Sequence, residues 1–149
     1  MPTLDKTIGQ LNQLLVICHD GQRYCEDFSR MAHDPNLKQF FTGRGLEWAS
    51  AGEQTQRIIQ TYGGRPRLHT SLDGKIHRSW ENLKAVLGNN DDYAMLDECL
   101  RFEAEARQCY DQALQQQLAP WAHHHLSDQY ELLLERQAQV RALLSAWRS

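Results

Sequence analysis

Apolar residues recur at steps of three and four along four long stretches of the chain. Such steps keep the apolar side chains on one face of an α-helix, whereas a strand would need alternation, which no segment sustains. The pattern therefore predicts four amphipathic helices, near residues 3–33, 35–62, 92–117 and 121–147. Because each helix has a single face to bury, we expect an all-α four-helix bundle.

The residues between these stretches predict how the helices connect. Asp34-Pro35 suits the N-cap and first position of the second helix, Gly63-Gly64 ends it, and Pro120 opens the last helix. Short links make the first and second helices neighbours, and likewise the third and fourth. The second and third are separated by the long stretch 63–90.

That long stretch predicts a short helix of its own near residues 72–87, with Trp80 on its apolar face. We expect Trp80 to pack against the bundle. The stretch is long enough to return along the bundle, which is the crossover of ferritin-like bundles rather than the up-down-up-down arrangement. A short helix that only caps one end of the bundle is the alternative.

Composition narrows the class of protein without indicating a chemistry. The chain of 149 residues fits one domain spanning 1–149, and its formal charge of −3 comes without any basic run. We therefore expect no nucleic-acid partner. No apolar run approaches the length of a membrane helix, and the N-terminus lacks a signal pattern, so we expect no membrane association and a cytoplasmic protein. A homo-oligomer or a protein partner remains open.

The four cysteines are interpreted first as small buried core residues. Cys18 and Cys25 lie about 10 Å apart along one helix at 1.5 Å per residue, too far to form a disulfide with each other. Cys99 and Cys109 are separated in the same way on the third helix. The alternative is a redox or metal-binding thiol pair between the first and third helices.

Gly21 stands in the middle of the first predicted helix. A helical glycine costs about 1 kcal/mol relative to alanine. Its presence therefore indicates a close approach of a neighbouring helix or a local bend.

The metal-ligand motif of ferritin-like di-metal bundles, Glu-x-x-His on each of two helices, is absent. None of the seven histidines has a carboxylate three residues before it. We therefore expect no standard di-iron oxidase and predict no cofactor. The alternative is a divalent metal such as iron in an atypical site.

A set of polar residues interrupts the apolar faces near mid-bundle: Gln22, Arg44, Thr55, Glu103 and Gln137. Glu103 is the most suggestive, because a buried lone carboxylate costs on the order of several kcal/mol unless it is paired, protonated or metal-bound. One interpretation is a degenerate metal site that combines Glu103 with Glu26, Glu47 or His19. The other, which we favour, is a polar layer in which Arg44, Gln137 or a tyrosine hydroxyl pairs with Glu103 and fixes helix register.

The stretch from Ser71 to Trp80, followed by Asn82-Leu83-Lys84-Ala85, resembles a bacterial family of ferritin-like four-helix bundles of unknown function (domain of unknown function 2383 type). The similarity extends over essentially the whole chain, through the residues Leu11-Asn12, Asp20-Gly21, Arg101, Glu103, Ala106, Tyr110, Leu114 and Arg136-Gln137. The resemblance implies a ferritin-like fold and a bacterial, cytoplasmic setting. It implies no activity, because the family has none to transfer.

Three functions fit these observations. We favour a non-enzymatic helical bundle with a stress-associated or protein-interaction role. The alternative is an atypical metal-binding or iron-handling ferritin-like protein. The third possible function is a carrier that binds a small apolar ligand between the helices, and no residue of the sequence points to it directly.

Overall fold

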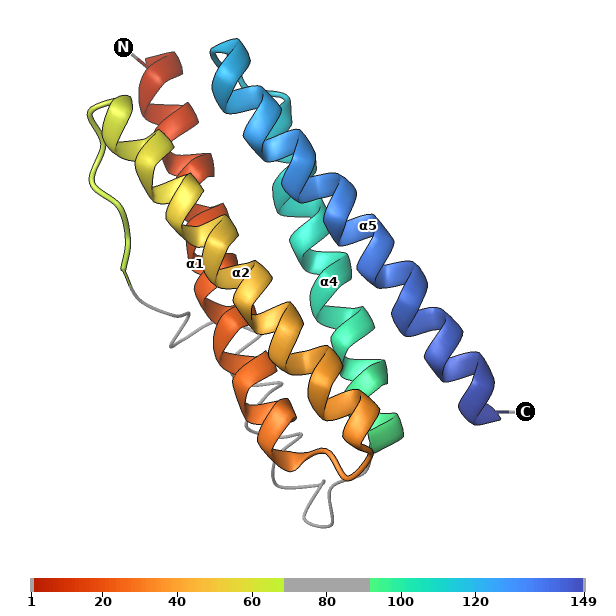
Figure 1. Cartoon of the computed structure of the whole chain (residues 1–149). Helices are drawn as coiled ribbons and strands as arrows, with labels where there is room; N and C mark the ends of the chain where they lie inside the picture. The colour runs from red at the N-terminus through yellow and green to blue at the C-terminus, as the bar shows by residue number, and fades with distance from the viewer. Residues whose placement is uncertain (1, 69–91, 149) are drawn as a thin grey trace.

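The computed structural model describes residues 2–68 and 92–148 and contains four long α-helices and no strand within them. The helices are α1 (Pro2–Met31), α2 (Pro35–Thr61), α4 (Asp92–Leu114) and α5 (Pro120–Arg148), which pack side by side as a bundle (Figure 1). The four helices predicted from the apolar pattern are confirmed, with the third ending near 114 rather than 117. The predicted helix at 72–87 and the docking of Trp80 lie outside the described residues.

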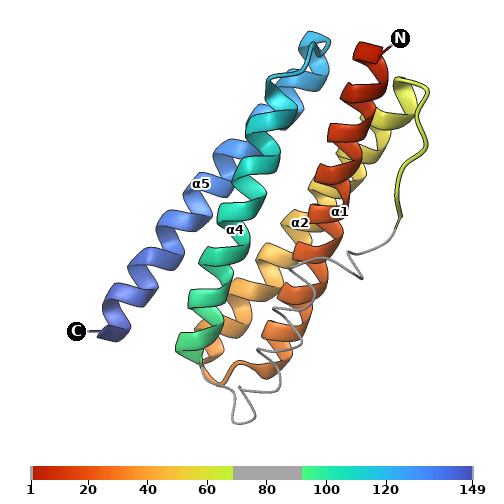
Figure 2. The same ribbon diagram turned by 180° about the vertical axis from the view of Figure 1, so that it is seen from behind.

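Hydrogen bonds at the two ends of the bundle fix the directions of the helices. At one end, the Asp92 carboxylate at the start of α4 accepts from the backbone N–H groups of His33 and Asp34, both at 2.9 Å. At the other end, the Tyr62 hydroxyl after α2 accepts from the Ala119 N–H at 2.9 Å. Therefore α2 and α4 run in the same direction, while α1 and α5 run opposite to them (Figures 1 and 2).

The ends of α2 follow the predicted breakers. Asp34 is the N-cap, with extended backbone and a side chain that accepts from the Asn36 N–H at 2.8 Å, and Pro35 occupies the first turn. Beyond α2, Gly63 adopts a φ of 82°, which a residue with a Cβ disfavours, and the Gly64 N–H donates to the Ile59 carbonyl. The chain thus turns sharply away from the helix.

Asn12 of α1 holds the residues that follow this turn. Its amide donates to the Arg65 carbonyl at 3.0 Å and accepts from the Arg67 N–H at 2.8 Å. The segment leaving α2 is therefore held against α1 by buried Asn12.

The core is made by the predicted apolar faces. Its largest fully buried side chains include Trp48, Tyr110, Phe28 and Phe41. Edge-to-face ring contacts join Phe28 to Phe41 and Trp48 to Phe102, so the aromatic packing links α1, α2 and α4. None of the helices in residues 2–68 and 92–148 has the length and apolar character to cross a membrane.

The contact between α1 and α2 is unusually close because glycines line it. A Cβ on Gly21 would lie 2.7–2.8 Å from three ring carbons of Trp48, so the indole sits directly against the α1 backbone. On α2, a Cβ added to Gly45 would lie 3.4 Å from the Cys25 Cβ, and one added to Gly52 would lie 3.5 Å from the Cys18 Cβ, both ordinary contact distances. Of the two explanations for Gly21, a close helix approach or a local bend, these contacts support the close approach.

Candidate functional site

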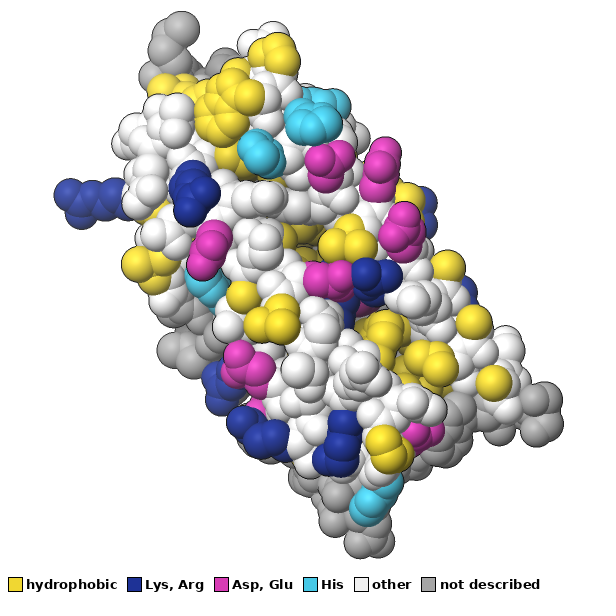
Figure 3. Space-filling view, viewed as in Figure 1, with side chains coloured by type: hydrophobic (Ala, Val, Ile, Leu, Met, Phe, Trp, Pro, Cys, Tyr) yellow, Lys and Arg dark blue, Asp and Glu magenta, His cyan; other side chains and the backbone are white. Residues whose placement is uncertain are grey.

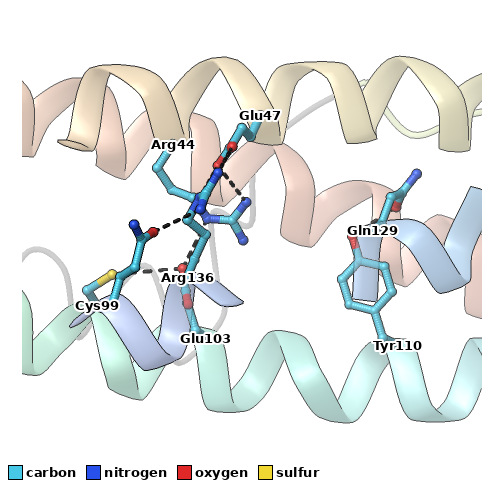
Figure 4. Close-up of polar contacts among 8 residues, drawn as sticks. Arg44, Glu47, Cys99, Glu103, Tyr110, Gln129 and Arg136 are labelled. Atoms are coloured by element: carbon cyan, nitrogen blue, oxygen red, sulfur yellow. Dashed lines mark hydrogen bonds and ion pairs between the residues drawn. The ribbon is translucent and has the colours of Figure 1, made fainter. Parts of the chain in front are cut away.

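A buried ion pair lies at the centre of the bundle. Arg44 projects from α2 and Glu103 from α4, and the Arg44 Nε donates to Glu103 Oε1 at 3.2 Å (Figure 4). Arg44 is 4% exposed and Glu103 is fully buried. Of the predicted partners of Glu103, which were Arg44, Gln137 and a tyrosine hydroxyl, Arg44 is the one that pairs with it. The second carboxylate oxygen, Oε2, is also buried and has no hydrogen-bond partner among the described residues.

The ion pair continues to the surface through two further charged residues. Arg44 Nη1 donates to Glu47 Oε1 at 3.4 Å, one turn along α2. Arg136 of α5 donates to both carboxylate oxygens of Glu47, from Nε to Oε1 at 2.9 Å and from Nη2 to Oε2 at 2.6 Å. Two cations and two anions alternate, so their charges balance, and this bidentate contact joins α5 to α2.

Arg44 is also held by an aromatic ring. Its guanidinium carbon lies 4.3 Å from the centroid of the Trp48 ring, a cation–π contact. The same ring contacts Gly21, so the packing of α1 against α2 helps to fix the guanidinium.

The environment shifts the pKa values of the charged groups in physically distinct ways. Burial raises the pKa of Glu103, and the charge and hydrogen bond of Arg44 only partly oppose it. For Arg44, burial acts to lower the pKa, but the nearby Glu103 carboxylate outweighs it and the pKa is raised. Burial acts to raise the pKa of Glu47, yet the hydrogen bond from Arg136 and the charge of Arg44 lower it overall.

The four candidate metal ligands do not share one environment. Glu103 and Glu47 both contact Arg44. Glu26 is exposed on α1, where it accepts a hydrogen bond from Gln22 at 3.2 Å, and His19 is partly buried on the same helix. Across residues 2–68 and 92–148, no three His, Cys, Asp or Glu residues are grouped so that they could hold a metal ion.

The other residues of the predicted polar layer have separate partners. Thr55 is buried and donates to the Ala51 carbonyl of its own helix at 2.8 Å. Gln137 is buried, but its Oε1 has no hydrogen-bond partner within the described part of the chain. The layer is therefore a set of local contacts around one ion pair rather than a continuous network.

All four cysteines are free thiols, and Cys18, Cys25 and Cys99 are buried. Burial raises the pKa of Cys18 to about 12 and that of Cys99 well above its ordinary value. Cys99 Sγ lies 3.9 Å from Glu103 Oε1, so the thiol borders the ion pair (Figure 4). Protonated, buried thiols are poor nucleophiles, which agrees with a packing role.

A cavity of about 200 Å³ adjoins the ion pair on the side where α2 faces α5. It is lined by Arg44, Glu47, Trp48, Ser50, Ala51, Gln54, Tyr110, Asp128, Gln129 and Leu132. Figure 3 shows a hollow on this face, beside an acidic and a basic side chain.

Gln129 of α5 organises the wall of this cavity. Its Oε1 accepts from the Tyr110 hydroxyl at 2.9 Å, and its Nε2 donates to Gln54 Oε1 at 2.9 Å. Sequence reasoning missed the roles of Gln129 and Arg136. The available signal was spacing, because Gln129 follows Leu126 by three residues and precedes Leu133 by four, which places it on the buried face.

The chain belongs to the family described as "Domain of unknown function (DUF2383)", whose sequence model matches residues 6–116. The match includes Arg44, Glu47 and Glu103, and it ends before α5, which supplies Gln129 and Arg136. No curated protein matches the chain.

Proposed function

We propose that this member of the DUF2383 family is a non-enzymatic helical bundle with a protein-interaction or stress-associated role, and that it lacks a di-iron site. The observation that carries the proposal is the Arg44–Glu103 pair. In a di-metal bundle the central carboxylate would bind a metal ion, whereas here it pairs with the guanidinium of Arg44.

Electrostatics explains why this pair disfavours a metal at the centre. A divalent ion bound to Glu103 would lie close to the positive charge of Arg44, in an interior where charges are weakly screened. The neighbouring Glu47 is engaged by Arg44 and Arg136 together. Cys99 would have to lose a proton to become a ligand, and burial raises its pKa.

A ferritin-like topology is part of the same proposal. It is supported by the parallel directions of α2 and α4, because the end of α2 and the start of α4 lie at opposite ends of the bundle. A crossover connection is therefore part of the proposal, and a helix that only caps one end of the bundle is the alternative that we disfavour. The family resemblance supports a bacterial and cytoplasmic setting.

A protein partner or a second copy of the chain is supported by the exposed apolar side chains. Leu46 on α2 is 69% exposed and Trp121 on α5 is 43% exposed. Isolated apolar residues are common on protein surfaces, so these two positions support the interaction role without defining an interface.

Metal analysis of the protein purified without a nickel column tests the proposal. We expect no stoichiometric iron, manganese or zinc. Glu103→Gln and the exposed control Glu53→Gln should then give the same metal content as the wild type. Stoichiometric metal that Glu103→Gln abolishes and Glu53→Gln retains would overturn the proposal.

That result would establish the second candidate function, an atypical metal-binding or iron-handling protein. One observation favours it, namely the buried Glu103 Oε2 without a hydrogen-bond partner among the described residues. A comparison of Glu103→Gln with Glu103→Leu adds a test of the pairing itself. The glutamine keeps an acceptor for Arg44, so its loss of stability should be smaller than that of the leucine.

A further inference from the structure

We propose that the cavity between α2, α4 and α5 is a binding site for a small, planar, uncharged molecule of one or two aromatic rings that carries a hydrogen-bond acceptor. This site goes beyond the interaction role, and it stands or falls independently of the metal test. The size, wall chemistry and charge of the cavity each contribute one part of the assignment.

The volume sets the size of the ligand. Drug-sized ligands occupy pockets of roughly 300–1,000 Å³, whereas an apolar cavity of about 150 Å³ accepts benzene. The cavity here, at about 200 Å³, lies between these limits. It therefore fits one ring or two fused rings.

The walls favour a planar ligand. Trp48 and Tyr110 are each 1% exposed, and both line the cavity together with the aliphatic Leu132. Aromatic walls stabilise a planar guest through stacked or edge-to-face contacts. The Tyr110 ring is held by its hydrogen bond to Gln129, so this wall is set in place before any ligand arrives.

The wall charges are already compensated, which disfavours a charged ligand. Arg44 is paired with Glu103 and Glu47, and Glu47 is paired in turn with Arg136. Asp128 lines the cavity with a side chain 62% exposed, and it faces His124 at 3.3 Å. Neither an anion nor a cation would find an unpaired buried opposite charge here.

One hydrogen-bond donor on the wall is left for a ligand. Half-buried Gln54 uses its carbonyl oxygen to accept from Gln129, which leaves its amide N–H₂ as a donor. A ligand with an acceptor atom can bind this amide, so it gains more than a hydrocarbon of the same shape.

Quinoline is a suitable probe, because it has two fused rings, a nitrogen acceptor and no charge at neutral pH. Naphthalene has the same shape without the acceptor, and 2-naphthoate adds a negative charge. We expect saturable 1:1 binding of quinoline in a ligand-observed NMR titration, with both comparison probes at least about tenfold weaker, a factor worth one well-made hydrogen bond.

Substitutions of residues that line the cavity test whether quinoline binds there. Ser50 lines the cavity at an exposed position of α2, so Ser50→Leu should occupy its mouth with little effect on folding, and Ser50→Ala leaves it open. The leucine should weaken quinoline binding by at least about tenfold and the alanine by less than about twofold. Gln54→Met, which removes the amide donor and keeps an unbranched side chain, should weaken quinoline but not naphthalene, and the exposed control Gln60→Met should change neither.

The proposal is overturned by any of three results on protein whose helical circular dichroism matches that of the wild type. These are no saturable quinoline binding by the wild type, quinoline binding that survives Ser50→Leu unchanged, or 2-naphthoate or naphthalene binding as tightly as quinoline. Because Gln54→Met and Ser50→Leu perturb the cavity differently, a folding defect in one leaves the other as the test.

Discussion

The two sides of α2 are packed by different means. Toward α1, the contact is built from glycines and small thiols, with the Trp48 ring lying on Gly21. Toward α5, the contact is built from long polar side chains, chiefly Glu47 with Arg136 and Gln54 with Gln129, and a cavity of about 200 Å³ lies beside them. The α1 side is closely packed, whereas the α5 side contains a cavity and is held by hydrogen bonds and an ion pair.

Because of this difference, we expect the α1 side of α2 to be rigid and the α5 side to rearrange more easily. Close-packed side chains with no voids change little without a large cost in free energy. A polar, partly open contact rearranges more cheaply, since surface ion pairs contribute at most about 1 kcal/mol each. Binding is therefore expected on the α5 side of α2, and mutations on the two sides should have different consequences.

The largest effect is expected where the two sides meet, at Arg44. Arg44→Met leaves Glu103 buried without its cation, and breaking a buried pair in this way costs about 3–5 kcal/mol. Urea denaturation measures the change in the free energy of unfolding. The double variant Arg44→Met/Glu103→Leu removes both charges and should regain most of the loss. A double variant no more stable than Arg44→Met would contradict the pairing.

The close-packed side is probed by Gly21→Ala. The new methyl group meets the Trp48 ring at 2.7–2.8 Å, and overpacking of this kind costs about 1–3 kcal/mol, against about 1 kcal/mol gained from helix propensity. Gly43→Ala is the matched control, because Gly43 lies in α2 with nothing within 4 Å of an added Cβ. We expect thermal unfolding to show a lower Tm for Gly21→Ala and a higher one for Gly43→Ala. Equal shifts would mean that the α1–α2 contact adapts.

At acid pH, the buried carboxylate of Glu103 and the partly exposed carboxylate of Glu47 should affect stability in opposite ways. Burial raises the pKa of Glu103, so the folded state holds that proton more tightly than the unfolded chain. Its contribution to stability is then present below the ordinary pKa of 4.5 and is lost as pH rises through the folded value. The pKa of Glu47 is lowered, chiefly because Arg136 and Arg44 outweigh burial, so its contribution is present above 4.5 and is lost as pH falls.

Stability measured against pH for the wild type, Glu103→Gln and Glu47→Gln checks these signs. With rising pH, the advantage of the wild type over Glu103→Gln should shrink, and its advantage over Glu47→Gln should grow. Two slopes of the same sign would contradict the assigned environments.

The smallest effect is expected at the open side itself. Arg136 and Glu47 are each 25% exposed, so Arg136→Ala should cost only about 0.2–1 kcal/mol of global stability. The local effect should be clearer, because this pair joins α5 to α2. Hydrogen exchange should quicken in α5 more than in α1. Arg141→Ala, at an exposed position of α5, is the control, and equal exchange in both variants would show that the ion pair does not hold α5.

Much of the fold could be predicted because helix formation and helix ends depend on neighbouring residues. The Asp34-Pro35 start of α2, the Gly63 turn and the Pro120 start of α5 all rest on local backbone chemistry. The candidate site was predicted only in part. Glu103 stood out because a carboxylate on an apolar face needs a partner, but Arg44, Gln137 and tyrosines were equivalent choices at that level.

The sequence by itself determined the apolar face of each long helix, the approximate helix ends, and that Glu103 needs compensation, since periodicity and capping act over a few residues. Only the tertiary structure decided that Arg44 compensates it across 59 residues of sequence and that Arg136 reaches Glu47 across 89. Those contacts, and the cavity beside them, depend on the rotation and height of each helix against its neighbours. Packing of all four helices sets these two quantities together, and no single amphipathic face encodes them.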